Sequence, residues 1–177
     1  MKFIPSKIDG VFLIELEKRG DQRGFFSRMF CAEEFASAGL ESRFVQANTS
    51  FSAESATLRG MHYQRAPHAE AKLVKCVAGA LYDVALDLRP DSPSFGKYQA
   101  FELTSQNRSM VYIPKGCAHG FMTLLPNSEI MYLVSANYAP EAEDGVRYDD
   151  PAFGIEWPLT PSQISAKDIS YKNYERM

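Results

Sequence analysis

Alternation of apolar and polar side chains with a period of two is the sequence feature that most constrains this fold. Its clearest run covers residues 80–88, and the turn-forming sequence Arg-Pro-Asp-Ser-Pro at 89–93 ends that run. Because successive side chains of a β-strand point to opposite faces, such a run predicts a strand with one buried face. Residues 98–103, 110–113 and 129–137 form similar short runs that are rich in β-branched and aromatic residues.

Few segments predict a helix. Residues 32–38 do, with Gly39 placed to end the helix, and a short helix is also expected in the tail after Trp157. No internal repeat, low-complexity segment or linker divides the chain, so we expect one domain over residues 1–177. Many short strands with Gly and Pro turns predict an all-β sandwich or barrel, with a jelly roll among the candidates.

Composition and charge disfavour several function classes. The chain has 45% hydrophobic and 12% aromatic residues, which is typical of a globular protein, and its net charge of -3 gives no footprint for nucleic acid or an acidic membrane. Pro5 comes before any apolar signal-peptide core can form, and no apolar run approaches the roughly 20 residues that span a bilayer. Cys31, Cys76 and Cys117 are odd in number and widely spaced, which favours reduced thiols and a cytoplasmic location.

The segment Leu-Arg-Gly-Met-His-Tyr-Gln at 58–64 brings Arg59 and His62 into an otherwise apolar stretch, and Lys72 follows shortly after it. Such groups are costly to bury without partners, so the pattern favours a site that binds an anion and moves a proton. A hydrogen-bonded interior histidine is the alternative interpretation of His62. Strict alternation would place Arg59 and His62 on opposite faces of a strand, unless a bulge at Gly60 turns one of them.

A second histidine, His119, ends a P-x-G-x-x-H sequence at 114–119 that resembles the second sequence motif of the cupin superfamily. The first cupin motif supplies two histidines one residue apart and then a carboxylate, but this chain has only His62 at that place. Two histidines without a nearby carboxylate provide too few ligands for a transition-metal site. We therefore expect a barrel without a metal, and not a metal-dependent dioxygenase.

Several segments between Gly10 and about Asp168, in order and with few gaps, are together similar to the dTDP-4-dehydrorhamnose 3,5-epimerase family. They are residues 21–26, 46–50, 58–64, 71–74, 83–89, 114–121, 138–143 and 149–151. The resemblance implies a cupin-type jelly roll, a double-stranded β-helix, with short peripheral helices and no cofactor. It also implies a homodimer in which the N-terminal strand of one subunit completes the site of the other.

The family acts on a nucleotide-linked 4-keto-6-deoxyhexose, whose keto group acidifies the hydrogens on C3 and C5. By resemblance, His62 is the base and Asp168 orients it. Lys72 steadies the enolate, and Tyr132 is the acid on the opposite face. Spacing alone could not distinguish Tyr132 from the other tyrosines. The substrate-binding positions that the resemblance implies are Arg23, Arg28, Gln46, Asn48, Arg59, His119, Tyr138, Glu143 and Lys167.

Three positions depart from the family pattern at the nucleotide end of the site. Arg28 stands where the family commonly has glutamate, Ala47 replaces an aspartate, and Thr49 replaces a frequent histidine. An ionised carboxylate only accepts hydrogen bonds, whereas a guanidinium only donates them. These departures predict a weakened preference for thymidine.

Three other activities stay open at this point. An epimerase acting at C3 or C5 alone could use the same catalytic residues. A 3,4-ketoisomerase on the same scaffold would not need the full pattern of segments. A catalytically silent cupin that binds sugar nucleotides would not need a matched acid and base.

Overall fold

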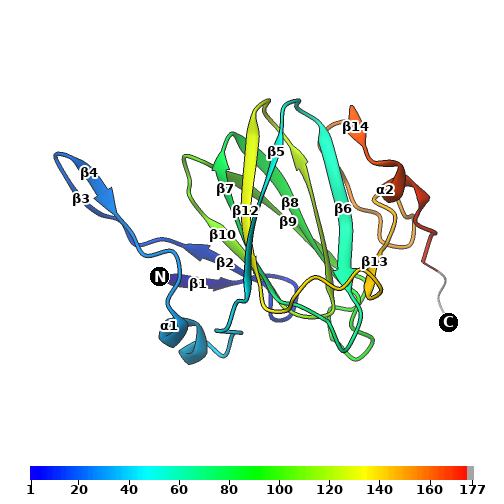
Figure 1. Ribbon diagram of the computed structural model, residues 1–177, viewed down its shortest axis with the longest axis horizontal. Helices are drawn as coiled ribbons and strands as arrows, with labels where there is room; N and C mark the ends of the chain where they lie inside the picture. The colour runs from blue at the N-terminus through cyan, green and yellow to red at the C-terminus, as the bar shows by residue number, and fades with distance from the viewer. Residues whose placement is uncertain (175–177) are drawn as a thin grey trace.

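Two β-sheets face each other and enclose a core of apolar side chains in this computed structural model, which describes residues 1–174 (Figure 1). The first sheet has the order β1 (Lys2–Pro5), β2 (Phe12–Glu15), β10 (Met110–Ile113), β7 (Lys72–Ala78), β12 (Ser128–Val134) and β5 (Gln46–Ser52). The second has the order β13 (Glu143–Gly145), β6 (Thr57–Gln64), β11 (Cys117–Thr123), β8 (Ala80–Asp87) and β9 (Tyr98–Thr104). The short strand β14 (Gln163–Ile164) pairs with β6 in parallel, and the other pairings are antiparallel. The expected all-β jelly roll is confirmed.

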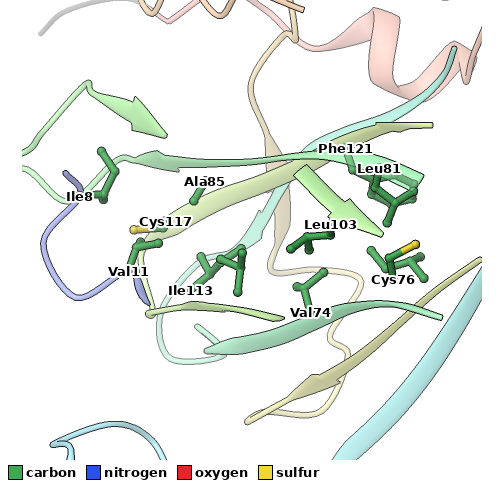
Figure 2. Close-up of a cluster of buried hydrophobic side chains, with 12 residues drawn as sticks. Ile8, Val11, Val74, Cys76, Leu81, Ala85, Leu103, Ile113, Cys117 and Phe121 are labelled. Carbon is green, nitrogen blue, oxygen red and sulfur yellow. The ribbon is translucent and has the colours of Figure 1, made fainter. Parts of the chain in front are cut away.

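Part of the space between the sheets is filled by a cluster of buried apolar side chains that both sheets supply (Figure 2). Strand β8 shows why the period of two matters: Leu81 and Ala85 enter this cluster, whereas Val84 and Leu86 enter a second cluster on the other face of the same sheet. Full burial of a leucine side chain stabilises the fold by roughly 1.5–3 kcal/mol relative to exposure. Both faces of β8 therefore hold it in register.

Most of the expected elements coincide with observed ones. The run at 110–113 is β10, the run at 98–103 is β9 extended by one residue, and the run at 80–88 is β8 without its last residue. The run at 129–137 becomes β12, which ends at Val134 because the chain then turns and Ser135 N–H bonds Ala71 O. The helix expected at 32–38 is α1 (Ala32–Ser37), and Gly39 follows it with the positive φ of +73° that favours glycine.

Three peripheral elements complete the described chain. Helix α1 packs Phe35 against the outer face of the first sheet, in contact with Tyr112. Strands β3 (Arg19–Asp21) and β4 (Gly24–Phe26) form a hairpin that projects away from the barrel (Figure 1). The helix expected in the tail is α2 (Ala166–Ser170), which lies beside β6.

None of the helices in residues 1–174 is long and apolar enough to cross a membrane. The last three residues of the expected domain 1–177 lie outside the described residues.

Candidate active site

A cavity of about 780 Å³ opens between the two sheets, and its walls follow the strand alternation. On β12 the lining residues are Ile130, Tyr132 and Val134, every second residue of the strand. On the neighbouring β5, Gln46, Asn48 and Ser50 line the cavity in the same way. The sheet pleat thus presents one set of side chains to the cavity and sends the intervening ones, including Ala47, to the outer face.

A β-bulge at Gly60 brings Arg59 and His62 to the same wall. His62 pairs with His119 and Arg59 pairs with Phe121, so two residues of β6 stand opposite Gly120 alone on β11. Gly60 has a φ of +124°, and a Cβ placed there would overlap the backbone of Gly120 and lie 2.9 Å from His119 O. The extra residue shifts the alternation by one position. The bulge that the sequence suggested is therefore confirmed.

His62 and Asp168 form a hydrogen-bonded pair in this wall. His62 Nε2 lies 2.6 Å from Asp168 Oδ1, and the Asp168 side chain is 4% exposed. Ser165 caps helix α2 by accepting a bond from the Asp168 N–H at 3.0 Å, which fixes where the carboxylate sits. Burial alone would raise the pKa of Asp168, but the His62 ring, Gly60 N–H and Ser165 hold that pKa below its ordinary value. Asp168 is therefore an ionised partner of the imidazole.

The tautomer of His62 follows from this pair. An ionised carboxylate accepts a proton from Nε2–H, which leaves the lone pair on Nδ1. Within residues 1–174, no group hydrogen-bonds Nδ1. The Tyr171 ring packs edge-on against the imidazole, with 6.0 Å between the ring centroids. His62 is thus an oriented imidazole that lines the cavity, and its Nδ1 has no hydrogen-bond partner among the described residues.

Lys72 lies on the opposite sheet, at the start of β7, and its ammonium contacts Glu70 Oε1. Both residues are buried and line the cavity. Gln64 donates a bond from Nε2 to Glu70 Oε2 at 2.7 Å. A buried cation with a bonded carboxylate beside it avoids the cost of an unpaired buried charge.

Tyr132 projects from β12 into the same cavity, on the sheet opposite His62. Burial raises the pKa of its hydroxyl, the positive charge of Arg59 lowers it, and the negative charge of Glu70 raises it. The net direction is upward. Tyr132 is therefore a protonated group that lines the cavity on the sheet opposite His62.

A second histidine and an arginine add positive or donor groups to the wall formed by β6 and β11. His119 Nε2 lies 2.8 Å from Oδ2 of the fully buried Asp83. Arg59 donates to Ser52 Oγ at 3.4 Å and to Phe51 O at 3.2 Å. A guanidinium and an imidazole in one wall are suited to holding phosphate oxygens.

The cavity mouth holds a small polar network. Glu143 Oε2 accepts bonds from Lys167 Nζ at 2.5 Å and from the Tyr138 hydroxyl at 2.7 Å. Although burial would raise the pKa of Glu143, these two contacts hold it below its ordinary value. The Tyr138 side chain is exposed, and the backbone N–H of this residue donates a hydrogen bond to Gln46 Oε1 at 2.9 Å. An exposed tyrosine ring on a fixed backbone offers a surface on which a planar ring could stack.

Eleven of the thirteen residues that the sequence analysis named line this one cavity. The two exceptions are Arg23 and Arg28. Arg23 lies in the turn between β3 and β4 with 85% of its side chain exposed and pairs with Asp21, and Arg28 pairs with Glu34 of α1. The effect of Arg28 and Ala47 on nucleotide preference stays a prediction, because neither side chain lines the cavity of the single chain.

Three further residues at the site escaped the sequence analysis: Glu70, Asp83 and Ser165. Glu70 carried a usable signal, since it stands two residues before Lys72 and extends the same face of the chain. Ser165 also carried one, since a serine three residues before an acidic residue is a typical helix N-cap. Asp83 carried none, because its partner His119 lies 36 residues away. In the described part of the chain, no three His, Cys, Asp or Glu side chains are grouped so as to hold a metal ion.

Comparisons with known proteins give one consistent result. The sequence profile of the family described as dTDP-4-dehydrorhamnose 3,5-epimerase matches residues 5–176. The dTDP-4-dehydrorhamnose 3,5-epimerase of Sinorhizobium fredii is 44% identical over 171 residues, which cover 96% of this chain and 88% of that protein. A dTDP-4-dehydrorhamnose 3-epimerase from Streptomyces niveus is 38% identical over 169 residues, covering 95% of this chain and 81% of that protein.

A solved structure extends the similarity to three dimensions. The crystal structure of dTDP-4-dehydrorhamnose 3,5-epimerase from Bacillus anthracis, with TDP and pyrophosphate bound, superposes with a TM-score of 0.94 at 38% identity. The superposition covers 98% of this chain and 99% of that one.

Proposed function

The chain belongs to the dTDP-4-dehydrorhamnose 3,5-epimerase family, and on that premise we propose that it epimerises a dTDP-linked 4-keto-6-deoxyhexose through an enolate, in deoxysugar biosynthesis. The observation that carries the proposal is the placement of His62 and Tyr132. They come from opposite sheets and line the same cavity, so a sugar ring between them has a base on one face and an acid on the other. A protein that only binds sugar nucleotides needs no such pair.

The reaction begins with removal of a proton from a carbon next to the keto group. The Nδ1 lone pair of His62 takes this proton, and the imidazolium that forms is stabilised by Asp168. The electron pair moves onto the keto oxygen, which becomes an enolate. The Lys72 ammonium stands across the cavity from His62 and offsets this developing negative charge.

Inversion is completed from the other wall. The Tyr132 hydroxyl gives its proton to the same carbon on the face opposite His62, and the carbonyl re-forms. In a chair of glucose configuration the hydrogens on C3 and C5 are axial on the same face. One base can therefore serve both carbons, so a 3,5-epimerase and a 3-epimerase can share these residues.

The remaining cavity residues bind the nucleotide part of the substrate. Arg59 and His119 hold the diphosphate, for which a guanidinium is well suited. The residues that contact the nucleoside are at the mouth and on β5: Gln46, Asn48, Tyr138, Glu143 and Lys167.

We further propose a homodimer in which the β3–β4 hairpin reaches the partner subunit's cavity. The resemblance supports a homodimer in which an N-terminal strand of one subunit completes the site of the other. The hairpin is our choice for that segment, because Arg23 is highly exposed and lies outside the cavity of its own chain. The three free cysteines, two of them buried, support a cytoplasmic location.

Hydrogen exchange with solvent tests the proposed function. In deuterium oxide, dTDP-4-keto-6-deoxyglucose should gain deuterium at C3 and C5 if both centres are epimerised, and at one carbon if only one is. A sugar-nucleotide-binding protein would leave every C–H bond untouched, and that result would overturn the proposal.

His62→Ala tests the base in the same assay. It should lower exchange at every epimerised carbon by roughly 10²-fold or more, because general acid–base catalysis commonly contributes 10²–10⁴-fold. Affinity for dTDP, measured by calorimetry, should change little, since Arg59 and the mouth residues remain. Exchange at the wild-type rate would show that another group is the base.

A further inference from the structure

Glu70 is a buried carboxylate to which the proposed reaction gives no task. It is 9% exposed and lines the cavity just before β7. Its Oε1 contacts the ammonium of Lys72, and its Oε2 accepts the bond from Gln64 Nε2 at 2.7 Å. A charge that is buried at a site is costly to keep, so its presence calls for a reason.

Glu70 lies between two hydrogen-bond donors, the Gln64 amide and the Lys72 ammonium. Gln64 Oε1 accepts from the Ala139 N–H at 2.6 Å, and the two hydrogens on its Nε2 are shared among three acceptors, which are Glu70 Oε2, His68 O at 2.9 Å and Asn137 O at 3.2 Å. These bonds fix the Gln64 amide with its donor towards Glu70. Lys72 presents a second donor. An ionised carboxylate offers an oxygen to each donor, whereas an amide offers only one.

We propose that Glu70 is a positioning residue for proton transfer, which holds the Lys72 ammonium at the cavity wall and balances its charge beside Tyr132. The inference rests on the proposed function. An ammonium that is already fixed meets the enolate oxygen without reorganisation as charge develops, and this is the arrangement that stabilises such a transition state most.

The charged and titratable groups around Tyr132 identify the effect of Glu70 that can be measured. Among the described residues that line the cavity with Tyr132, these groups are Arg59, His62 and Tyr63 on β6, His119 on β11, Lys72 on β7 with Glu70 just before it, Tyr138, Glu143 on β13, and Lys167 and Asp168 on α2. The two charges that act on the Tyr132 hydroxyl are Arg59 and Glu70. Strand β5 presents Gln46 and Asn48, which do not titrate. Burial raises the pKa of Tyr132, Arg59 lowers it and Glu70 raises it. Without the negative charge of Glu70, the Tyr132 hydroxyl should ionise at a lower pH. Once it is ionised, it can no longer donate a proton.

The test compares inversion with exchange as pH is raised in Glu70→Gln. Exchange needs only the base, whereas inversion also needs protonated Tyr132, so the ratio of inversion to exchange falls as Tyr132 ionises. We expect this fall to occur on the order of one pH unit lower in the variant. Exchange itself should slow on the order of tenfold, because the misplaced ammonium meets the enolate less well.

Three further variants separate positioning from a purely structural role. Glu129→Gln removes a negative charge from the other face of β12 and should leave the ratio unchanged at every pH. Tyr132→Phe should give a low ratio at every pH. Glu70→Asp keeps the charge but cannot reach both donors, so it should exchange slowly with a wild-type pH dependence, and it keeps the test open if Glu70→Gln does not fold.

An unmoved pH dependence in folded Glu70→Gln, or normal exchange in Glu70→Asp, would overturn this inference while leaving the proposed function intact. Absence of exchange in the wild-type protein would instead contradict the proposed function. A wild-type ratio in Tyr132→Phe would contradict the assignment of the acid, whatever Glu70 does.

Discussion

At the scale of the residue, the proposed role of His62 as the base depends on the charge of a partner 106 positions away, Asp168. The two oxygens of Asp168 accept from His62 and, at 3.4 Å, from Gly60 N–H. Asp168→Asn leaves one acceptor for these two donors and removes the charge that stabilises the imidazolium. If the amide nitrogen turns to His62, the imidazole has to accept at Nε2, and Nδ1 then carries the hydrogen.

Asp168→Asn should therefore slow hydrogen exchange by roughly 10²-fold or more, with little change in dTDP affinity. The matched control is Asp150→Asn, because Asp150 is also a buried carboxylate that accepts backbone N–H bonds, but it does not line the cavity. Exchange measured by mass spectrometry should be normal in this control. Equal losses in both variants would mean that Asp168 acts only through the stability of the fold.

Single residues show where sequence reasoning reached the site and where it stopped. His62, Lys72 and Arg59 stood out because charged groups in an apolar strand need a reason to be there. Tyr132 and Asp168 required the family resemblance, since nothing local distinguishes one strand tyrosine or one tail aspartate from another. Asp83 was missed because its role is set by contact with His119 on the neighbouring strand, which no local pattern encodes.

At the scale of the element, the bulge in β6 decides whether the site exists. Gly60→Ala would force a Cβ against the backbone of Gly120 and place alanine at a φ of +124°. We expect it to lower the free energy of unfolding by roughly 2–4 kcal/mol, from backbone strain and the steric overlap together. A thermal melt should show a midpoint lower by roughly 5–15 °C, since 1 kcal/mol corresponds to about 2–4 °C in a chain of this size.

Gly96→Ala is the control for backbone strain alone. Gly96 has a φ of +74°, and a Cβ placed there meets nothing within 4 Å. This substitution should lower the free energy of unfolding by only about 1 kcal/mol.

The folded fraction of Gly60→Ala should also lose exchange activity, because a strand that relaxes its bulge sends Arg59 or His62 to the other face. Equal melting midpoints for Gly60→Ala and Gly96→Ala would show that the close approach to Gly120 does not add to the loss of stability.

Elements were predictable to the extent that their signals are local. The period of two identified β8, β9 and β10, and Gly39 marked the end of α1. The end of β12 was placed three residues too late, because Ser135 and the residues after it keep a strand-like composition while the chain turns. The bulge could be suspected from Gly60, but its existence depends on the residue opposite, Gly120.

At the scale of the whole molecule, the jelly roll could be expected from many short strands, but the strand order could not. His62 and His119 are direct partners across β6 and β11, and Tyr132 faces them from the other sheet. Such pairings are set by the burial of whole faces and not by neighbouring residues. For the same reason, the set of residues that line the cavity could be identified only from the arrangement of both sheets.

The proposed exchange of hairpins between subunits makes a prediction about mixtures of inactive variants. If Arg23 acts in the partner's cavity, each active site combines His62 of one chain with Arg23 of the other. Arg23→Ala and His62→Ala should both be poorly active alone. A mixed dimer of the two would contain one site with both residues intact and one site with neither.

Co-refolding equal amounts of the two variants should therefore restore on the order of a quarter of the wild-type exchange rate, because half of randomly formed dimers are mixed and each has one complete site. Lys97→Ala co-refolded with His62→Ala provides the reference for simple dilution, since Lys97 lies outside the cavity. If Arg23 acted in its own chain, every site in the mixture would carry one defect and activity would not return. Sedimentation that shows only monomers would contradict the shared site directly, because a hairpin that projects from the barrel then has no second cavity to complete.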